Sequence, residues 1–148
     1  MVSSDETEVA ILTRSECLEH LSRASIGRVG ASINALPVIL PVHFTLFEDS
    51  VLFRTTTGTK LDAAIIGAVI AFQADSYEPV GGTGWSVLFQ GIATVVNDSR
   101  ATSVPIKPWG PTHSELHLVR VEATHLTGRR FGVAGDGPRV AFPDTPSP

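Results

Sequence analysis

Runs of β-branched and aromatic residues, separated by turn-forming residues, dominate this chain from Gly27 onward. The first three runs are GRVGASI, LPVILPVHFTLF and SVLFRTT, with turn signals at Asn34 and at residues 48–50 between them. Side chains of the first kind fit a half-buried pleated surface, whereas Asn, Asp and Ser favour the turns that connect strands. Three consecutive runs of this kind predict an antiparallel meander.

Two residues indicate where the sheet departs from regular geometry. Pro41 interrupts the second run, and because proline cannot donate to a strand ladder it indicates an edge position, a bulge or a break. Gly91 lies in the middle of the longest strand pattern, GWSVLFQGIATVVND, and indicates a bulge or tight bend that lets a sheet curl. We therefore expect the sheet to close into a barrel.

The first helical pattern is short. Thr13 and Glu16 have the spacing of a capping box, and Cys17, Leu18 and Leu21 follow at helical steps. The pattern predicts an amphipathic helix that carries the Cys17 thiol on its apolar face. We expect this thiol to be buried as a small hydrophobic group rather than to be reactive.

The remaining segments alternate between helix, loop and strand patterns. A second helical pattern begins after Lys60, and Gly67 is expected to end it. Residues 99–111 contain three prolines and predict a loop or a short irregular helix. Residues 115–131, ELHLVRVEATHLTGRRF, predict a single last strand.

Composition sets limits on the size of the fold and on its partners. The 148 residues fit one domain, and their 43% hydrophobic content against 18% charged content favours an oligomer. We expect residues 1–10 to be a flexible N-terminus, residues 11–134 to be a single domain and residues 135–148 to be a flexible Gly- and Pro-rich tail. A net charge of -4 gives no basic surface for nucleic acid or for an anionic membrane.

The sequence also favours a cytoplasmic location. Cys17 is the one cysteine, so it cannot form an intramolecular disulfide. The N-terminal stretch MVSSDETEVA has neither the basic nor the apolar region of a signal peptide, and no apolar run is long enough to cross a bilayer.

The side-chain sets of common catalytic chemistries are missing from the sequence. It contains no HExxH motif, no paired cysteines, no nucleophile elbow and no Walker loop. His113 and His117 are four residues apart, but this spacing pairs two side chains only in a helix, which this segment does not predict. We expect no metal site and no side-chain nucleophile, so a bound cofactor would have to carry the chemistry.

The stretch VLFRTTTGTKL, residues 51–61, is a candidate phosphate-binding turn. Arg54 and Lys60 supply positive charge, four threonines supply short donors, and Gly58 lets the backbone approach a ligand closely. The alternative is purely structural: a hairpin strand followed by a helix that Thr59 and Asp62 cap.

The order of these segments resembles a known family. GRVGASI, LPVILPVHF, VLFRTTTGTKLDAA, VIAFQAD, GWSVLFQGIATVV, PWGP and LVRVEATHLTGRRF are similar to segments of the pyridoxamine 5′-phosphate oxidase-like, FMN-binding split-barrel proteins. The similarity runs from Thr13 to Phe131, and FRTTTGTKL and GWSVLFQG are its most specific parts. It implies a mainly β fold, a six-stranded antiparallel split β-barrel with a few short peripheral helices, and a homodimer with FMN at the subunit interface.

The resemblance also implies which residues contact the cofactor. The residues after the third strand would line the phosphate and ribityl chain, His43 would lie near the isoalloxazine ring, and the GWSV segment would flank the ring. An aromatic side chain of the partner subunit, Trp109, would close the groove. The implied cofactor-binding residues are His43, Arg54, Thr55, Thr57, Gly58, Thr59, Lys60, Leu61, Trp85, Ser86, Val87 and Trp109.

The resemblance implies an FMN-dependent oxidoreductase that exchanges two electrons or a hydride with an unidentified small molecule. Oxidation of pyridoxamine phosphate itself would need further basic groups for a second phosphate, and the last strand offers only Arg129 and Arg130. Two alternatives share the fold: a reductase that uses the deazaflavin F420, and a non-enzymatic flavin- or haem-binding module. A haem would need an axial ligand such as His43.

Overall fold

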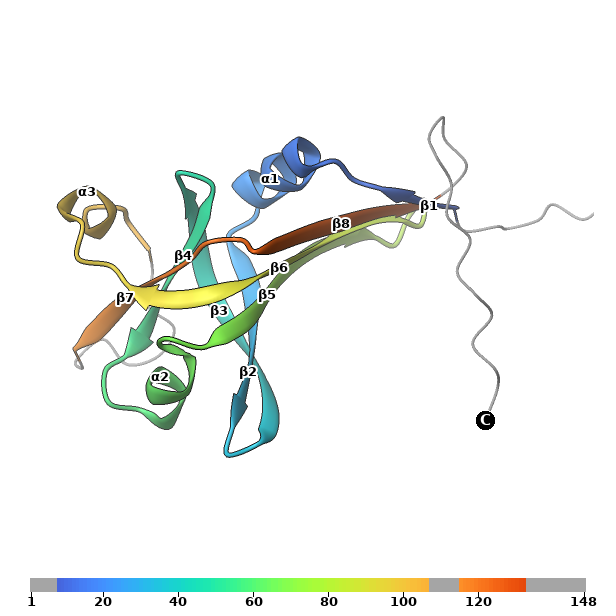
Figure 1. The fold of residues 1–148 in the computed structure, drawn as a ribbon. Helices are drawn as coiled ribbons and strands as arrows, with labels where there is room; N and C mark the ends of the chain where they lie inside the picture. Colours follow the sequence, from blue (N-terminus) through green and yellow to red (C-terminus); the bar gives the residue numbers. More distant parts are fainter. Residues whose placement is uncertain (1–7, 107–114, 133–148) are drawn as a thin grey trace, which may run out of the picture.

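The computed structural model describes residues 8–106 and 115–132. Its strands pair in an antiparallel sheet, and its helices are short and peripheral (Figure 1). In chain order the elements are β1 (Glu8–Ile11), α1 (Arg14–Arg23), β2 (Ile26–Ile33), β3 (Leu36–Phe47), β4 (Ser50–Thr56), α2 (Lys60–Ile65), β5 (Val69–Glu78), β6 (Thr83–Val95), α3 (Ser99–Thr102), β7 (Leu116–Val121) and β8 (His125–Gly132).

Six of these strands close into a ring, as the sequence predicts. The strand order is β1-β8-β6-β5-β2-β3-β4-β7, and an additional pairing of β6 with β7 joins the two ends of the six-stranded part. The consecutive strands β2, β3 and β4 form the predicted antiparallel meander. The six-stranded antiparallel split β-barrel is therefore confirmed, and β8 and β1 extend the sheet beyond the ring.

Two-residue turns connect the strands of the meander. Asn34 and Ala35 join β2 to β3 with φ of 50° and 63°, and Glu48 and Asp49 join β3 to β4 with φ of 49° and 61°. Positive φ at both central residues is the geometry that matches the twist of an antiparallel hairpin, and Asn and Asp tolerate it. The turn residues seen in the sequence thus fix the register of both hairpins.

The prediction of a single last strand over residues 115–131 is wrong. The chain leaves the sheet after Val121 and re-enters it at His125, so β7 and β8 are separate strands. β6 pairs with β8 up to Gln90 and with β7 from Ala93 onward. Gly91 lies at this change of partner, where a Cβ atom would be 1.8 Å from the Glu122 carbonyl oxygen. The glycine is needed because the backbone of the β7–β8 connection crosses directly over it.

Pro41 marks a stretch of β3 that lies at an edge of the sheet. Pro41 lies opposite Arg28 of β2, whereas β4 pairs with β3 only from Phe44 onward. The Phe44 N–H donates to the Ser25 carbonyl beside β2, so by the alternation of strand amides the Pro41 nitrogen faces away from β2. Pro41 therefore lies on an edge stretch, which was one of the three predicted possibilities.

The N-terminal boundary of the domain differs from the prediction. Residues 8–10, which the sequence assigns to a flexible terminus, belong to β1, and Val9 pairs with Phe131 of β8 and is buried. The pattern EVAI is too short to identify as a strand from sequence alone, because its pairing partner lies at the far end of the chain. The predicted tail, residues 135–148, lies outside the described residues.

The barrel encloses the main core, which is built around the fully buried rings of Phe53, Phe72 and Phe89. Helix α1 covers β8, β3 and β6 and buries Cys17 and Leu21 in this core (Figure 1). Burial raises the pKa of the Cys17 thiol, which fits the predicted inert role. The predicted capping box of α1 is also confirmed, since Thr13 and Glu16 exchange both hydrogen bonds.

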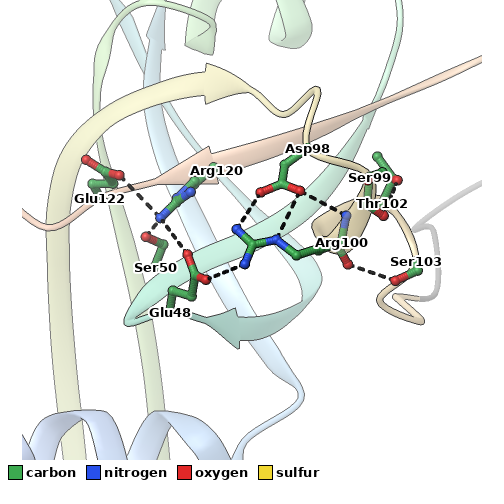
Figure 2. Close-up of polar contacts among 9 residues, drawn as sticks. All are labelled: Glu48, Ser50, Asp98, Ser99, Arg100, Thr102, Ser103, Arg120 and Glu122. Atoms are coloured by element: carbon green, nitrogen blue, oxygen red, sulfur yellow. Dashed lines mark hydrogen bonds and ion pairs between the residues drawn. The ribbon is translucent and has the colours of Figure 1, made fainter.

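A surface network of charged side chains ties α3 to the β3–β4 turn (Figure 2). Arg100 pairs with Asp98 at 3.0 Å and with Glu48 at 3.5 Å, and Arg120 of β7 lies 3.9 Å from the other Glu48 oxygen. The Arg120 Nε donates to the buried Ser50 hydroxyl at 3.0 Å. A single exposed ion pair contributes little to stability. In this network Arg100 and Arg120 both pair with Glu48, so α3, the β3–β4 turn and β7 are linked to one another.

No helix within the described residues has the length and apolar character needed to cross a membrane.

Candidate functional site

The candidate phosphate-binding turn joins β4 to α2. Gly58 adopts φ of +80°, a left-handed conformation that glycine takes without strain. Thr59 is the N-cap of α2, and its hydroxyl accepts from the Asp62 N–H at 3.1 Å and donates to the Thr56 carbonyl at 2.9 Å. The helix cap that the structural alternative predicts is therefore present, with Thr59 as the N-cap of α2.

A buried carboxylate stabilises the backbone of this turn. Asp62 is 5% exposed, and its Oδ1 atom accepts from the Thr55 hydroxyl at 2.6 Å and lies 2.8 Å from the His117 Nδ1. Its Oδ2 atom accepts from the Gly58 N–H at 3.2 Å. The carboxylate thus connects α2, β4, β7 and the turn itself, so it fixes the backbone at the point where a ligand would bind.

The charge of Asp62 is stabilised where it lies. Burial acts to raise its pKa, but hydrogen bonds from Thr55, His117 and Gly58 act in the opposite direction and leave the pKa below its ordinary value. Asp62 is therefore ionised at neutral pH, and its negative charge is used inside the turn rather than presented to a ligand.

A pocket of about 240 Å³ opens beside the turn. One wall is apolar and comes from β2, β3 and β4, and the other is formed by the end of β4 and the start of α2. This combination suits a ligand with a polar end and an apolar body. The lining residues are Val29, Leu40, Pro41, Val42, Phe53, Arg54, Thr55, Thr56, Thr59 and Leu61.

Two cations belong to this site. Arg54 lines the pocket, and Lys60 is the first residue of α2, between the lining residues Thr59 and Leu61. Neither takes part in an ion pair among the residues that the structure describes. A cation at a helix start is unfavourable by itself, so an anion bound at this position would relieve the cost.

A second group of predicted site residues lies on β6. The Trp85 ring stacks on His20 of α1 with 4.7 Å between ring centroids, and Val87 is fully buried in the core. Ser86 points to the opposite face and lines a separate pocket of about 290 Å³. Only Ser86 of these three therefore presents its side chain on the outer face, and the structure does not bring it together with the turn in one pocket.

The other two predicted residues lie apart from both pockets or outside the described chain. His43 is half-buried in β3, opposite Ile26 of β2. Trp109 lies outside the described residues. The cofactor roles of all twelve residues stay predictions.

Two side chains that hold the turn are not recognisable as its supports from the sequence. The sequence indicates Asp62 only as a capping partner and His117 only as a member of an unsuitable metal pair. An acid three residues after the N-cap Thr59 was the available signal for Asp62, whereas the contact with His117 joins residues 55 positions apart. Within the described residues no three His, Cys, Asp or Glu side chains gather as a metal site.

Asp62→Asn is expected to destabilise the protein at neutral pH by about 1 to 3 kcal/mol, because a buried carboxylate with three donors is lost. Since the folded pKa is depressed, the contribution is complete above the unfolded pKa of about 3.9 and is lost as the pH falls through the folded pKa. Urea unfolding of both proteins between neutral and acidic pH measures the difference, which should narrow at low pH.

The control is Asp49→Asn, which removes an exposed carboxylate from a turn whose positive φ Asn tolerates. A difference between Asp62→Asn and the parent protein that stays constant down to acidic pH would contradict the assigned charge.

The closed six-stranded ring, extended by β8 and β1, defines an antiparallel split β-barrel. The chain belongs to the pyridoxamine 5′-phosphate oxidase family, whose model matches residues 13–130.

Individual relatives agree with this assignment. The uncharacterized protein Rv0080 of Mycobacterium tuberculosis is 38% identical over 132 residues, which are 84% of this chain and 86% of that protein. The solved FAD binding protein of Mycobacterium smegmatis is 36% identical, with a TM-score of 0.67 over 83% of this chain and 98% of that one. A protein of unknown function from Corynebacterium diphtheriae is 31% identical, with a TM-score of 0.67 over 83% and 98% of the two chains.

Proposed function

We propose that the protein is an FMN-dependent oxidoreductase whose bound flavin supplies two-electron or hydride transfer to or from a small molecule. The observation that carries the proposal is the β4–α2 turn, where Arg54 and Lys60 adjoin a half-apolar pocket and have no ion-pair partner among the described residues. This arrangement fits a ligand with a dianionic phosphate at one end of an apolar ring system.

The hydrogen bonds inside the turn leave only some of its groups for a phosphate. The Thr55 hydroxyl donates to Asp62 and the Thr59 hydroxyl donates to the Thr56 carbonyl, so both hydrogens are already used. The phosphate would therefore be held by Arg54, Lys60 and the exposed Thr57 hydroxyl. Thr55 and Thr59 would act by keeping the turn in shape.

FAD and F420 are the competing cofactors. The 36% identical protein of Mycobacterium smegmatis is an FAD binding protein, which supports a flavin here without separating FMN from FAD. F420 has a longer anionic tail, which would need more cations than the two found at this turn. FMN matches the turn best because it carries one terminal phosphate.

We also propose that the protein is a homodimer with the cofactor at the subunit interface. Large apolar side chains are exposed on three strands of the ring: Ile39 of β3 is 73% exposed, Val69 of β5 is 72% exposed and Ile92 of β6 is 50% exposed. Ile39 and Val69 line the same pocket of about 360 Å³. An apolar surface of this kind favours burial against a second copy.

Reconstitution of the purified apoprotein with FMN, FAD, riboflavin or F420 tests the proposal. We expect one FMN per chain, seen as a shifted flavin absorption spectrum, and a dimeric mass by light scattering. Uptake of F420 without uptake of FMN would favour the deazaflavin alternative. A Soret band after haemin addition, with no flavin bound, would favour the haem-binding module and contradict the proposal.

A further inference from the structure

Two backbone amides at the tip of the β4–α2 turn are already bonded inside the protein. The Thr57 N–H donates to the Glu115 carbonyl at 2.9 Å, and the Gly58 N–H donates to Asp62 Oδ2 at 3.2 Å. Each of these amides has a single hydrogen, so neither can donate to a ligand without giving up its bond to the protein. A phosphate at this turn would therefore depend on side-chain charge more than on a ring of backbone amides.

The spacing of the two cations depends on the turn between them. Arg54 lies near the end of β4, and Lys60 begins α2. Asp62 joins these two elements, because its backbone belongs to α2 while its Oδ1 atom accepts from the Thr55 hydroxyl of β4 at 2.6 Å. A shift of this carboxylate would therefore change where Lys60 lies relative to Arg54.

His117 of β7 binds the same carboxylate oxygen. Its Nδ1 lies 2.8 Å from Asp62 Oδ1, and the residue lies directly opposite Thr55 in the register of β4 with β7. Asp62 is ionised and only accepts, so the His117 Nδ1 carries the hydrogen whether the ring is neutral or protonated. Because Asp62 is 5% exposed, water cannot readily replace a donor that is lost.

We propose that His117 is a positioning residue for the phosphate end of the cofactor. Its Nδ1–H holds the Asp62 carboxylate, and that carboxylate holds the turn that spaces the two cations. The proposal rests on the proposed function, and it gives a role to β7, which contributes no described residue to the lining of the pocket beside the turn. Loss of the donor leaves a buried carboxylate short of one hydrogen bond, so the start of α2 shifts and the phosphate is held less tightly.

Riboflavin separates this role from a general effect on the fold, because it lacks the phosphate. FMN and riboflavin are titrated into apoprotein carrying His117→Val or His117→Asn, with flavin fluorescence as the readout. Valine suits a half-buried strand position but donates nothing, whereas the asparagine amide can place a donor where Nδ1 lies. His117→Val should weaken FMN binding about threefold to tenfold and leave riboflavin binding unchanged, and His117→Asn should keep most of the FMN affinity.

His125→Val is the matched control, because His125 also lies on a strand and lines none of the described pockets. It should leave both affinities unchanged. The positioning role would be overturned if His117→Val kept the parent ratio of FMN to riboflavin affinity, whether by losing neither ligand or by losing both equally, as an unfolded protein would. It would also be overturned if His117→Asn lost as much FMN affinity as His117→Val. These results leave flavin binding by the parent protein intact, whereas a parent protein that binds neither FMN nor riboflavin would contradict the proposed function itself.

Discussion

A Gly91→Ala variant is expected to lose about 3 kcal/mol or more of its free energy of unfolding. The added Cβ atom would lie 1.8 Å from the Glu122 carbonyl oxygen and 2.9 Å from its carbonyl carbon. Both are backbone atoms, so no side-chain rotation can relieve the overlap. Inserting a methyl group into a well-packed site commonly costs about 1 to 3 kcal/mol, and a clash with backbone should lie at or beyond the upper end.

The matched control is Gly30→Ala, also in a strand of the ring. There the nearest atom to an added Cβ would be the Ala71 Cβ at 3.5 Å, which is ordinary van der Waals contact. Urea unfolding of the two apoproteins compares them directly. Equal stability of both variants would show that the connection between β7 and β8 does not cross over Gly91 as described.

Gly91 also shows what the sequence could and could not predict. A glycine in a long strand pattern indicates a bulge or tight bend, and in the structure Gly91 lies where β6 changes partner from β8 to β7. The sequence could not show that residues 122–124 supply the opposing backbone, because the β-strand pattern continues through them. The last strand divides because the barrel closes there. Barrel closure depends on strands that are far apart in the sequence, so a short stretch of sequence cannot predict it.

The hairpins, in contrast, could be predicted because their turn signals are local in the sequence. Asn34 and Asp49 are local signals for turns with positive φ, and both turns have that geometry. Once these turns are fixed, the alternation of apolar residues sets which side of each strand enters the core. Neighbouring residues therefore determine most of the meander.

The candidate site was predictable only in its local part. The turn itself is continuous in sequence, so its cations and glycine could be recognised together. Its support could not, because Asp62 binds His117 across 55 positions. Sequence proximity identifies the groups that could touch a ligand, whereas the groups that hold them in place come from distant strands.

Lys60→Ala is expected to weaken FMN binding about tenfold to a hundredfold while leaving riboflavin binding nearly unchanged. A charged hydrogen bond to phosphate contributes about 1.5 to 3 kcal/mol to binding. Riboflavin has no phosphate and does not make this hydrogen bond, so its affinity should not change. Arg54→Ala should show the same ratio, because Arg54 lines the same pocket. Titration of both ligands into refolded apoprotein measures the ratio for each variant.

The apoprotein provides an independent measurement. Lys60 begins α2, where the helix dipole disfavours a cation by a few tenths of a kcal/mol to about 1 kcal/mol, so Lys60→Ala should unfold at the same or slightly higher urea concentration. Arg14 begins α1 in the same way and lines none of the described pockets, so Arg14→Ala should share this small stability effect without any change in FMN affinity. Equal losses of FMN and riboflavin in Lys60→Ala would mean that the turn does not hold the phosphate, and the structural explanation of its threonines and glycine would then suffice.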